Sequence, residues 1–189
     1  ISCIGSRTGG KVDAWDAEFS ANKVLLDYGT ERNVNHFILL SAICVQKPVC
    51  EFQYAKLAFE QELMHSKLSY SIVRPTAFFK SLSGQINRVK AGKSFIIFDD
   101  GENTLCKPIS ENDLARYIVD CLTKTNRRNK ILPIGGPAPA ISSKTIGHII
   151  FQLLDKPPRF KSIPSKGFQL GRNLLSPLAY FSTRIKDFR

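Results

Sequence analysis

Lys56 and Tyr54 are the side chains whose types and positions most directly indicate chemistry in this sequence. They lie on a helix-periodic segment, residues 51–64, that follows a continuous apolar run at residues 36–45. An ammonium beyond the end of a buried strand can donate hydrogen bonds to ribose hydroxyls and lower the pKa of a neighbouring acid. Tyr54 is two residues from Lys56 and therefore lies on a different helical face. A surface lysine on an amphipathic helix is the alternative interpretation.

Short apolar runs alternate with helix-periodic segments along the first part of the chain. We predict strands at residues 1–6, 36–45 and 69–75, and helices at residues 13–30 and 51–64. The unbroken apolar run at 36–45 is typical of a strand that is buried on both faces. Strands that alternate with helices indicate βαβ units, so we predict an α/β fold with a doubly wound parallel sheet.

The pattern is looser after Pro75. Residues 94–101 and 104–109 have the character of short strands around an Asp-Gly loop, and Ser110 can cap a helix whose buried stripe is Leu114, Ile118 and Cys121 or Leu122. A strand at 130–134 and a helix through Ile146 to Leu153 follow. We therefore predict a core at residues 1–136 and a small C-terminal lobe with a basic tail at residues 137–189.

Composition narrows the classes of function. The net charge is +11, and residues 156–189 contribute +7 of it, so the tail could meet anionic lipid, nucleic acid or an acidic protein face, or could simply be solvated. The five cysteines are odd in number and have no CxxC spacing, which argues for a reducing compartment and against a disulfide scaffold or a zinc site. The three histidines are scattered, which argues against a metal centre.

Three segments are expected to meet at one edge of the predicted sheet. In a doubly wound sheet, ligands bind beyond the carboxyl ends of the strands. Residues 5–10 follow the first predicted strand, residues 41–48 the second and residues 74–79 the third. A helix that leaves the second of these loops would present Lys56 near the same crevice.

The residues of this crevice also carry a family resemblance. LLSAICVQKPVCEFQYAKLAFEQELM (39–64), YSIVRPTAFFKSLSGQI (70–86), CKPISENDLARYIVDC (106–121), ILPIGGP (131–137) and SRTGG (6–10) are together similar to the divinyl chlorophyllide 8-vinyl reductases of plants and algae. These belong to the atypical, NmrA-like short-chain dehydrogenases, which have an NAD(P)-binding Rossmann-like fold. The resemblance runs from about residue 2 to about residue 156 and fades after residue 158.

The resemblance implies that the chain uses NADPH to reduce the 8-vinyl group of divinyl chlorophyllide or protochlorophyllide in a chloroplast. Lys56 matches the lysine of the dehydrogenase helix, but Phe52 stands where the usual catalytic Tyr would be. The proton donor is therefore open between Tyr54, Lys56, Cys44 and water. The residues that match cofactor-contacting positions are Ser6, Arg7, Thr8 and Gly9 for the adenosine half, Ser41 and Ala42 at a strand end, and Arg74, Pro75, Thr76 and Phe78 for the nicotinamide.

The sequence departs from the family in one respect. No strand with a GxTGxxG loop, which would hold the cofactor pyrophosphate, precedes Ile1. We therefore expect either a fragment of a longer reductase or a fold without its first βαβ units, and weak NADPH binding by these 189 residues alone. The alternative is a non-catalytic, reductase-derived subunit of a photosynthetic membrane complex, in contact with the thylakoid through its basic tail. In either case we expect the stroma or the thylakoid surface, and no nucleic acid as partner.

Overall fold

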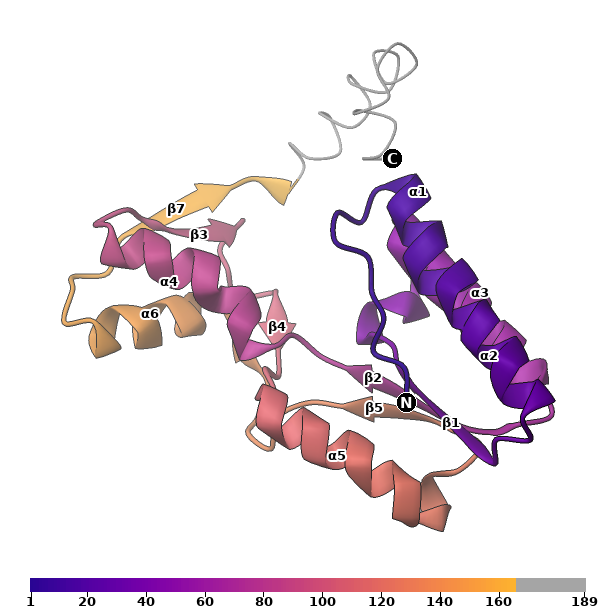
Figure 1. Ribbon diagram of the computed structural model, residues 1–189. Helices are drawn as coiled ribbons and strands as arrows, with labels where there is room; N and C mark the ends of the chain where they lie inside the picture. Colours follow the sequence, from indigo (N-terminus) through magenta and orange to yellow (C-terminus); the bar gives the residue numbers. More distant parts are fainter. Residues whose placement is uncertain (166–189) are drawn as a thin grey trace, which may run out of the picture. The chain divides into compact units, whose positions relative to one another are not determined.

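The computed structural model describes residues 1–165, so most of the predicted basic tail lies outside the described residues. The described chain divides into two compact units (Figure 1). The first unit contains residues 1–76 and 112–134, and the second contains residues 77–111 and 135–165. The chain thus enters the second unit twice, because residues 77–111 belong to it as well as the residues after 134.

A parallel sheet forms the centre of the first unit. Its strands are β1 (His36–Leu40), β2 (Ser69–Pro75) and β5 (Lys130–Ile134), in the order β1-β2-β5. The register places Leu39 beside Ile72 and Ile72 beside Ile131. Ser2 extends the sheet by one parallel bridge to Leu39 on the free side of β1. The parallel arrangement that the sequence predicts is confirmed.

Helices cover both faces of this sheet. A continuous helical segment consists of α1 (Lys11–Ala14), the π-helix η1 (Trp15–Ser20) and α2 (Ala21–Glu31). It lies with α3 (Glu51–His65) on one face, and α5 (Glu111–Thr123), followed by the short η4 (Thr125–Arg127), lies on the other (Figure 1). The apolar residues between the sheet and α2 and α3 are Leu26, Phe37, Leu39, Phe59, Leu63, Leu68 and Ile72. This is the doubly wound α/β fold expected of the sequence.

Two of the predicted strands are shorter than expected. In the segment at 1–6 only Ser2 pairs with β1, because the backbone N–H of Ser6 donates instead to the carboxylate of Glu18. The apolar run at 36–45 leaves the sheet after Leu40, and the short helix η2 (Ile43–Gln46) buries Val45 completely. Hydrophobicity alone cannot show where a buried segment changes from strand to turn.

The second unit is built from short elements. Strand β3 (Phe95–Phe98) pairs in parallel with β7 (Phe160–Ile163), and β4 (Leu105–Cys106) pairs antiparallel with β6 (Ile141–Ser142). The helices are η3 (Phe79–Leu82), α4 (Ser83–Lys90) and α6 (Ser143–Leu153). Six buried side chains of this unit form an apolar cluster: Val89, Phe95, Ile97, Ile146, Ile150 and Phe151.

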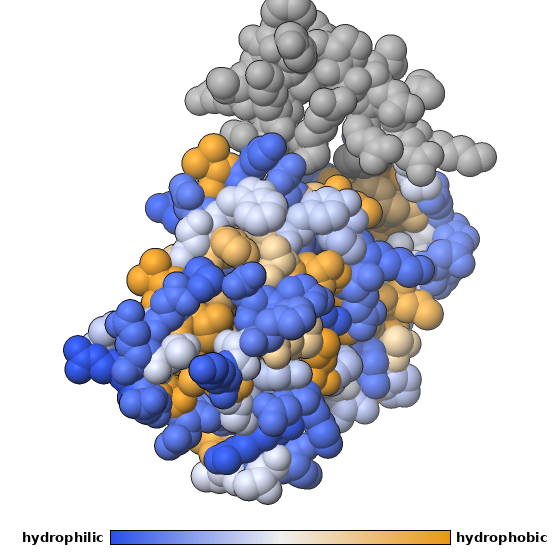
Figure 2. Space-filling model, turned by 90° about the vertical axis from the view of Figure 1, so that its right-hand side faces the viewer, coloured by the Kyte–Doolittle hydropathy of each residue, from blue (hydrophilic) through white to orange (hydrophobic). Residues whose placement is uncertain are grey.

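The surface of the first unit mixes polar and apolar residues. Helix α2 exposes Val24, Leu25 and Tyr28. On the face shown in Figure 2, apolar residues form separate patches among polar ones. Isolated exposed apolar residues are ordinary on folded proteins. Among the described helices, none has the length and hydropathy of a membrane span.

Candidate cofactor-binding site

The first turn of α3 is held in place by side chains. Gln53 Oε1 accepts hydrogen bonds from the backbone N–H groups of Val49, at 2.7 Å, and Cys50, at 3.3 Å, so groups just before the helix are satisfied. Trp15 Nε1 donates to Glu51 Oε2 at 2.9 Å and ties this turn to η1. The beginning of α3, and with it the position of Lys56 one turn later, is therefore fixed against the neighbouring helix.

The body of α3 places charged side chains beside an apolar stripe. The helical spacing predicts one apolar stripe of Phe52, Ala55, Phe59 and Leu63; the last three are completely buried, and Phe52 is half-buried. Lys56 and Glu60 each follow a residue of this stripe and are four positions apart, so both lie on the same side of the helix. That side faces the carboxyl ends of the parallel strands, because Lys56 reaches the carbonyl of Leu40, the last residue of β1.

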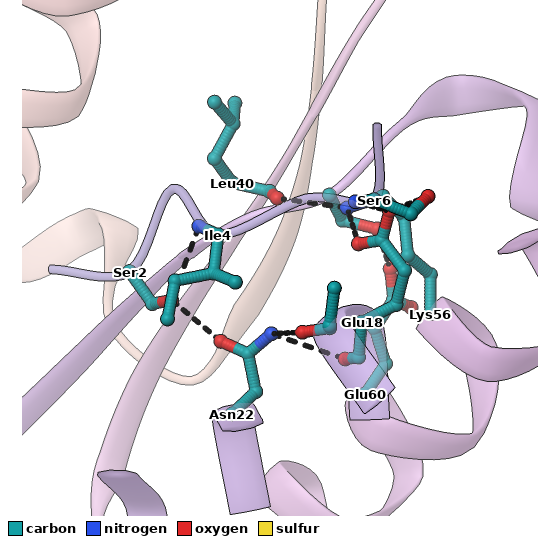
Figure 3. Close-up of polar contacts among 10 residues, drawn as sticks. Ser2, Ile4, Ser6, Glu18, Asn22, Leu40, Lys56 and Glu60 are labelled. Carbon is teal, nitrogen blue, oxygen red and sulfur yellow. Dashed lines mark hydrogen bonds and ion pairs between the residues drawn. The ribbon is translucent and has the colours of Figure 1, made fainter. Parts of the chain in front are cut away.

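Lys56 forms an ion pair that the sequence does not predict. Its Nζ lies 2.6 Å from Glu18 Oε2, and the two side chains are only 13% and 3% exposed. The other carboxylate oxygen, Oε1, accepts from the backbone N–H of Ser6 at 2.9 Å and from its hydroxyl at 3.0 Å (Figure 3). A weaker contact of 3.5 Å joins Lys56 Nζ to the Leu40 carbonyl. Glu18 thus connects the lysine of α3 with the loop after the first strand segment.

A second buried ion pair lies under the adjacent strand ends. Glu60 is completely buried, and both of its carboxylate oxygens bind the guanidinium of Arg74 from β2, with Arg74 Nε at 3.1 Å from Oε1. The Ser41 hydroxyl donates to the same Oε1 from the end of β1. Arg74 and Ser41 are two of the predicted cofactor-contacting residues, and the structure brings them together on one carboxylate.

The loop at residues 6–10 is organised by a second acid of the α1–η1 helical segment. Asp13 Oδ2 accepts from both the backbone N–H and the hydroxyl of Thr8, at 2.7 Å each. These hydrogen bonds to Thr8 lower the pKa of the Asp13 carboxyl. Gly9 has φ of 70°, a conformation that glycine adopts without strain. Arg7 in the same loop is exposed.

The remaining predicted cofactor-contacting residues are distributed over both units. Ala42 lies two residues beyond the end of β1, and Pro75 ends β2 in a buried position. Thr76 donates its N–H to the Ile134 carbonyl at 2.9 Å, so it continues the sheet of the first unit. Phe78 belongs to the second unit, where it forms a bridge with Ile109.

The predicted alternatives for a proton donor differ in burial. Tyr54 is 48% exposed and stays on a different face of α3 from Lys56, as its spacing predicts. Cys44 is half-buried within η2. Neither side chain belongs to the hydrogen-bonded groups around Glu18 and Glu60 in the described structure. Lys56 is the one among the named side chains that does.

Glu18, Glu60 and Asn22 are polar residues that the sequence analysis did not identify. All three are at most 3% exposed. Glu60 could have been found, because it stands one turn after Lys56 beside an apolar stripe. Glu18 and Asn22 give a weaker signal, since they sit on an amphipathic helix whose π-turn has no recognisable pattern in sequence.

The geometry fits the ribose end of a nicotinamide cofactor. A lysine ammonium has three N–H donors, and Glu18 and Leu40 accept two from Lys56. The third can donate to a ribose hydroxyl beyond the end of β1, where doubly wound sheets bind ligands. Lys56 and Arg74 lie at the same ends of neighbouring strands, and each is paired with a carboxylate, so these four side chains carry no net charge.

Comparison with known proteins supports a nicotinamide cofactor for this fold. Residues 1–125 match a family model described as NAD(P)H-binding. The chain is 48% identical, over 99% of its length, to the chloroplastic divinyl chlorophyllide a 8-vinyl-reductase of Cucumis sativus, and 51% identical, over 87% of its length, to that of Arabidopsis thaliana. The matches cover 46% and 41% of those two relatives, so the chain spans just under half of their length.

More distant similarities agree with the fold. The photosystem II assembly factor Ycf39 of Trieres chinensis is 24% identical over 79% of this chain and 46% of its own length. Among solved structures, the UDP-glucuronic acid 4-epimerase of Bacillus cereus in complex with NAD matches with a TM-score of 0.75 at 17% identity. That match covers 87% of this chain and 61% of the epimerase. At this identity the structural similarity shows the fold alone.

Proposed function

Since this chain belongs to the NAD(P)H-binding family, and its plant relatives are divinyl chlorophyllide a 8-vinyl-reductases, we propose that it reduces the 8-vinyl group of divinyl chlorophyllide or protochlorophyllide to ethyl with NADPH. The observation that carries the proposal is the placement of Lys56. Glu18 and the Leu40 carbonyl hold it at the carboxyl end of β1, and it is the residue that the family resemblance matches to the lysine of the dehydrogenase helix. By the same relatives we propose a plastid location, at the stroma or the thylakoid surface.

In the proposed reaction the cofactor supplies hydride, and a proton completes the conversion of vinyl to ethyl. Lys56 donates a hydrogen bond to the ribose and orients the ring, while Glu18 and Leu40 hold its ammonium. Glu60 binds both Arg74 and Ser41 and so keeps the ends of β1 and β2 in one arrangement, at the edge of the sheet where the cofactor would bind. Conjugation with the macrocycle delocalises the charge that hydride addition creates. Phe52 occupies the position of the catalytic Tyr of short-chain dehydrogenases, so that residue cannot supply the proton. The candidates for the proton donor are Lys56, Tyr54, Cys44 and water.

The test is a reductase assay with the full-length protein, divinyl protochlorophyllide and NADPH, in which the ethyl product is separated by chromatography. Lys56→Ala should lose NADPH affinity and activity. Lys23→Ala is the matched control, because Lys23 lies on α2 in an exposed ion pair with Asp27 and should leave both unchanged. No ethyl product from the unsubstituted protein would reject the proposal.

Removal of Lys56 should also affect folding. The amphipathic pattern alone would treat Lys56 as dispensable for stability, but its partner Glu18 is 3% exposed and would be left with a buried, uncompensated charge. Activity must therefore be compared at a temperature at which the variant is folded. This requirement separates loss of the cofactor contact from loss of the fold.

A non-catalytic role in the assembly of a photosynthetic complex is the alternative, and the assembly factor of Trieres chinensis is a more distant relative, at 24% identity, than the reductases. The same assay distinguishes the two. A full-length protein that binds NADPH but gives no ethyl product, and that copurifies with thylakoid membrane complexes, would favour the assembly role. Turnover by the isolated protein would favour the reductase.

A further inference from the structure

We propose that Glu18 is a positioning residue, which holds Lys56 and the loop of Ser6 in one arrangement before the cofactor binds. The inference rests on the proposed cofactor binding by Lys56 and deepens it. It starts from the fact that one buried carboxylate serves two segments that the sequence predicts to contact opposite halves of the same ligand.

The contacts of Glu18 divide cleanly between its two oxygens. Oε1 accepts both hydrogen bonds from Ser6, while Oε2 faces the Lys56 ammonium at 2.6 Å and has no further hydrogen bond in the described structure. The Lys56 side chain is 13% exposed against 3% for Glu18. The acid is thus almost fully enclosed, whereas part of the lysine side chain remains exposed. This difference in exposure is expected if Glu18 positions Lys56 and does not itself contact the ligand.

The helix around Glu18 is built to hold this position. Glu18 lies in the π-helix η1, and such wide turns inside helices often occur at functional sites. Asn22 Nδ2 donates to the backbone carbonyls of Ala17, at 3.1 Å, and Glu18, at 3.0 Å, within this turn. Asn22 Oδ1 accepts from the Ser2 hydroxyl at 2.5 Å (Figure 3). The backbone of Ser2 is in turn hydrogen-bonded to β1. Through Asn22 and Ser2, the backbone of Glu18 is therefore held at a fixed position relative to β1, the strand at whose end Lys56 lies.

Folding alone gives little reason for the pair. Replacement of a buried ion pair by apolar residues of similar volume is often neutral or stabilising, so such a pair is weak evidence for a stabilising role. A lysine has a long, flexible side chain, and a ligand that must order it loses affinity. A carboxylate that already fixes the ammonium removes this cost, and it directs the remaining N–H of Lys56 away from Glu18 and Leu40.

A double-mutant cycle in the full-length protein tests the inference, with NADPH fluorescence as the binding signal and urea unfolding as the stability signal. Glu18→Gln should raise the Kd for NADPH about 3- to 10-fold, the loss expected when one side chain must be ordered on binding. In the background of Lys56→Met, Glu18→Gln should raise the Kd no further, because Glu18 acts through Lys56. The double variant Glu18→Gln, Lys56→Met has no buried charge at this site, so it should unfold at a higher urea concentration than either single variant and still bind NADPH weakly.

The double variant would then recover stability without recovering NADPH affinity. A purely structural role of Glu18 would not give this result, because affinity would return together with stability. Ser142→Ala is the control, since it removes the N-cap hydrogen bond of α6 in the second unit. It should lower stability and leave the Kd unchanged. If Glu18→Gln fails to fold, Glu18→Asp gives the readout, because it keeps the charge and withdraws the carboxylate by one methylene. A folded Glu18→Asp variant with raised Kd supports the inference.

Three results would overturn the inference. One is an unchanged Kd in a folded Glu18 variant, and another is a Kd increase that adds fully to that of Lys56→Met. In both cases the proposed function stands, because the unsubstituted protein binds NADPH. The third result is absence of NADPH binding by the unsubstituted protein, which rejects the cofactor proposal together with the role of Glu18.

Discussion

The two units of this protein bury different kinds of side chain. Among the described residues, the buried polar side chains of the first unit are Ser2, Glu18, Asn22, Ser41, Gln53, Glu60, Ser71 and Arg74. In the second unit Ser142 is the buried polar side chain of the described part, and an apolar cluster around Phe95 and Ile150 fills the interior. Within residues 1–165, buried charged side chains are found in the first unit and not in the second.

This difference indicates where function lies. Desolvation of charged groups costs free energy, and an apolar interior of equal volume is often as stable or more stable. The ion pairs Lys56–Glu18 and Arg74–Glu60 are at the carboxyl ends of parallel strands, which is where ligands bind in this fold. We therefore expect defects in the first unit to affect both stability and cofactor binding, and defects in the second unit to affect stability.

The strongest test of this comparison is to break the Glu60–Arg74 pair. Glu60→Ala leaves the Arg74 guanidinium buried without its carboxylate and should lower the free energy of unfolding by about 3–5 kcal/mol. Urea denaturation measures this loss. Simultaneous replacement by Glu60→Leu and Arg74→Met should recover most of the stability, since no charge is then buried. A double variant as unstable as the single one would show that the pair is needed for folding.

A steric defect in the second unit should produce the next largest loss. A Cβ at position 147 would lie 2.4 Å from Phe160 Cε1 and 3.2 Å from Phe95 Cδ1, so Gly147→Ala should cost about 1–3 kcal/mol by overpacking. Thermal unfolding measures the cost, and NADPH affinity should not change. Gly84→Ala is the control, because a Cβ there meets nothing within 4 Å and alanine favours the helix. Reduced NADPH affinity in a folded Gly147→Ala variant would contradict the division between the units.

Loss of the one buried polar side chain described in the second unit should have a smaller effect. Ser142 is the N-cap of α6, and its hydroxyl accepts from the Thr145 N–H at 3.1 Å. Ser142→Ala should lower the free energy of unfolding by about 1 kcal/mol, the usual value for a lost N-cap. Chemical denaturation measures it. An effect above about 3 kcal/mol would exceed the range of a cap and indicate a larger polar role in this unit.

The smallest expected effect is a pH dependence in the first unit. Burial, together with the positive charge of Arg128, lowers the pKa of His36 below its ordinary value. The folded state then binds the proton less readily than the unfolded state, so this stabilising contribution is complete above about pH 6.5 and is lost as the pH falls through the folded pKa. Urea midpoints measured between pH 7 and pH 5 should decrease, and His36→Gln should reduce the decrease. The same decrease in His36→Gln would assign the effect to other groups, and His65→Gln, at an exposed position, is the matched control.

The elements of the first unit could be predicted because their signals are local. The apolar run at 36–45 predicted a buried strand, which ends at Leu40, and helical spacing predicted the stripe of Phe52, Ala55, Phe59 and Leu63, of which Phe52 is only half-buried. The strand β2 ends at Pro75, as expected. Local periodicity also predicted α5 and the burial of Leu114 and Ile118, and the structure selects Cys121 over Leu122 for the third position, because Leu122 is 48% exposed. The position of Lys56 near a strand end followed from the same spacing.

The residues that surround Lys56 could not be predicted from local sequence patterns. Glu18, Ser6 and Leu40 are distant from Lys56 in sequence, and the Glu60–Arg74 pair joins a helix to a strand. Helical periodicity marks Glu18 as one more residue of an amphipathic helix, since nothing local announces a π-turn. By itself the sequence determined the parallel α/β fold, the family and the lysine. Only the tertiary structure decided which carboxylates meet the buried cations, because ion pairs depend on distances through space between segments that pack together, whereas hydrophobic patterns depend on the geometry of a single helix or strand.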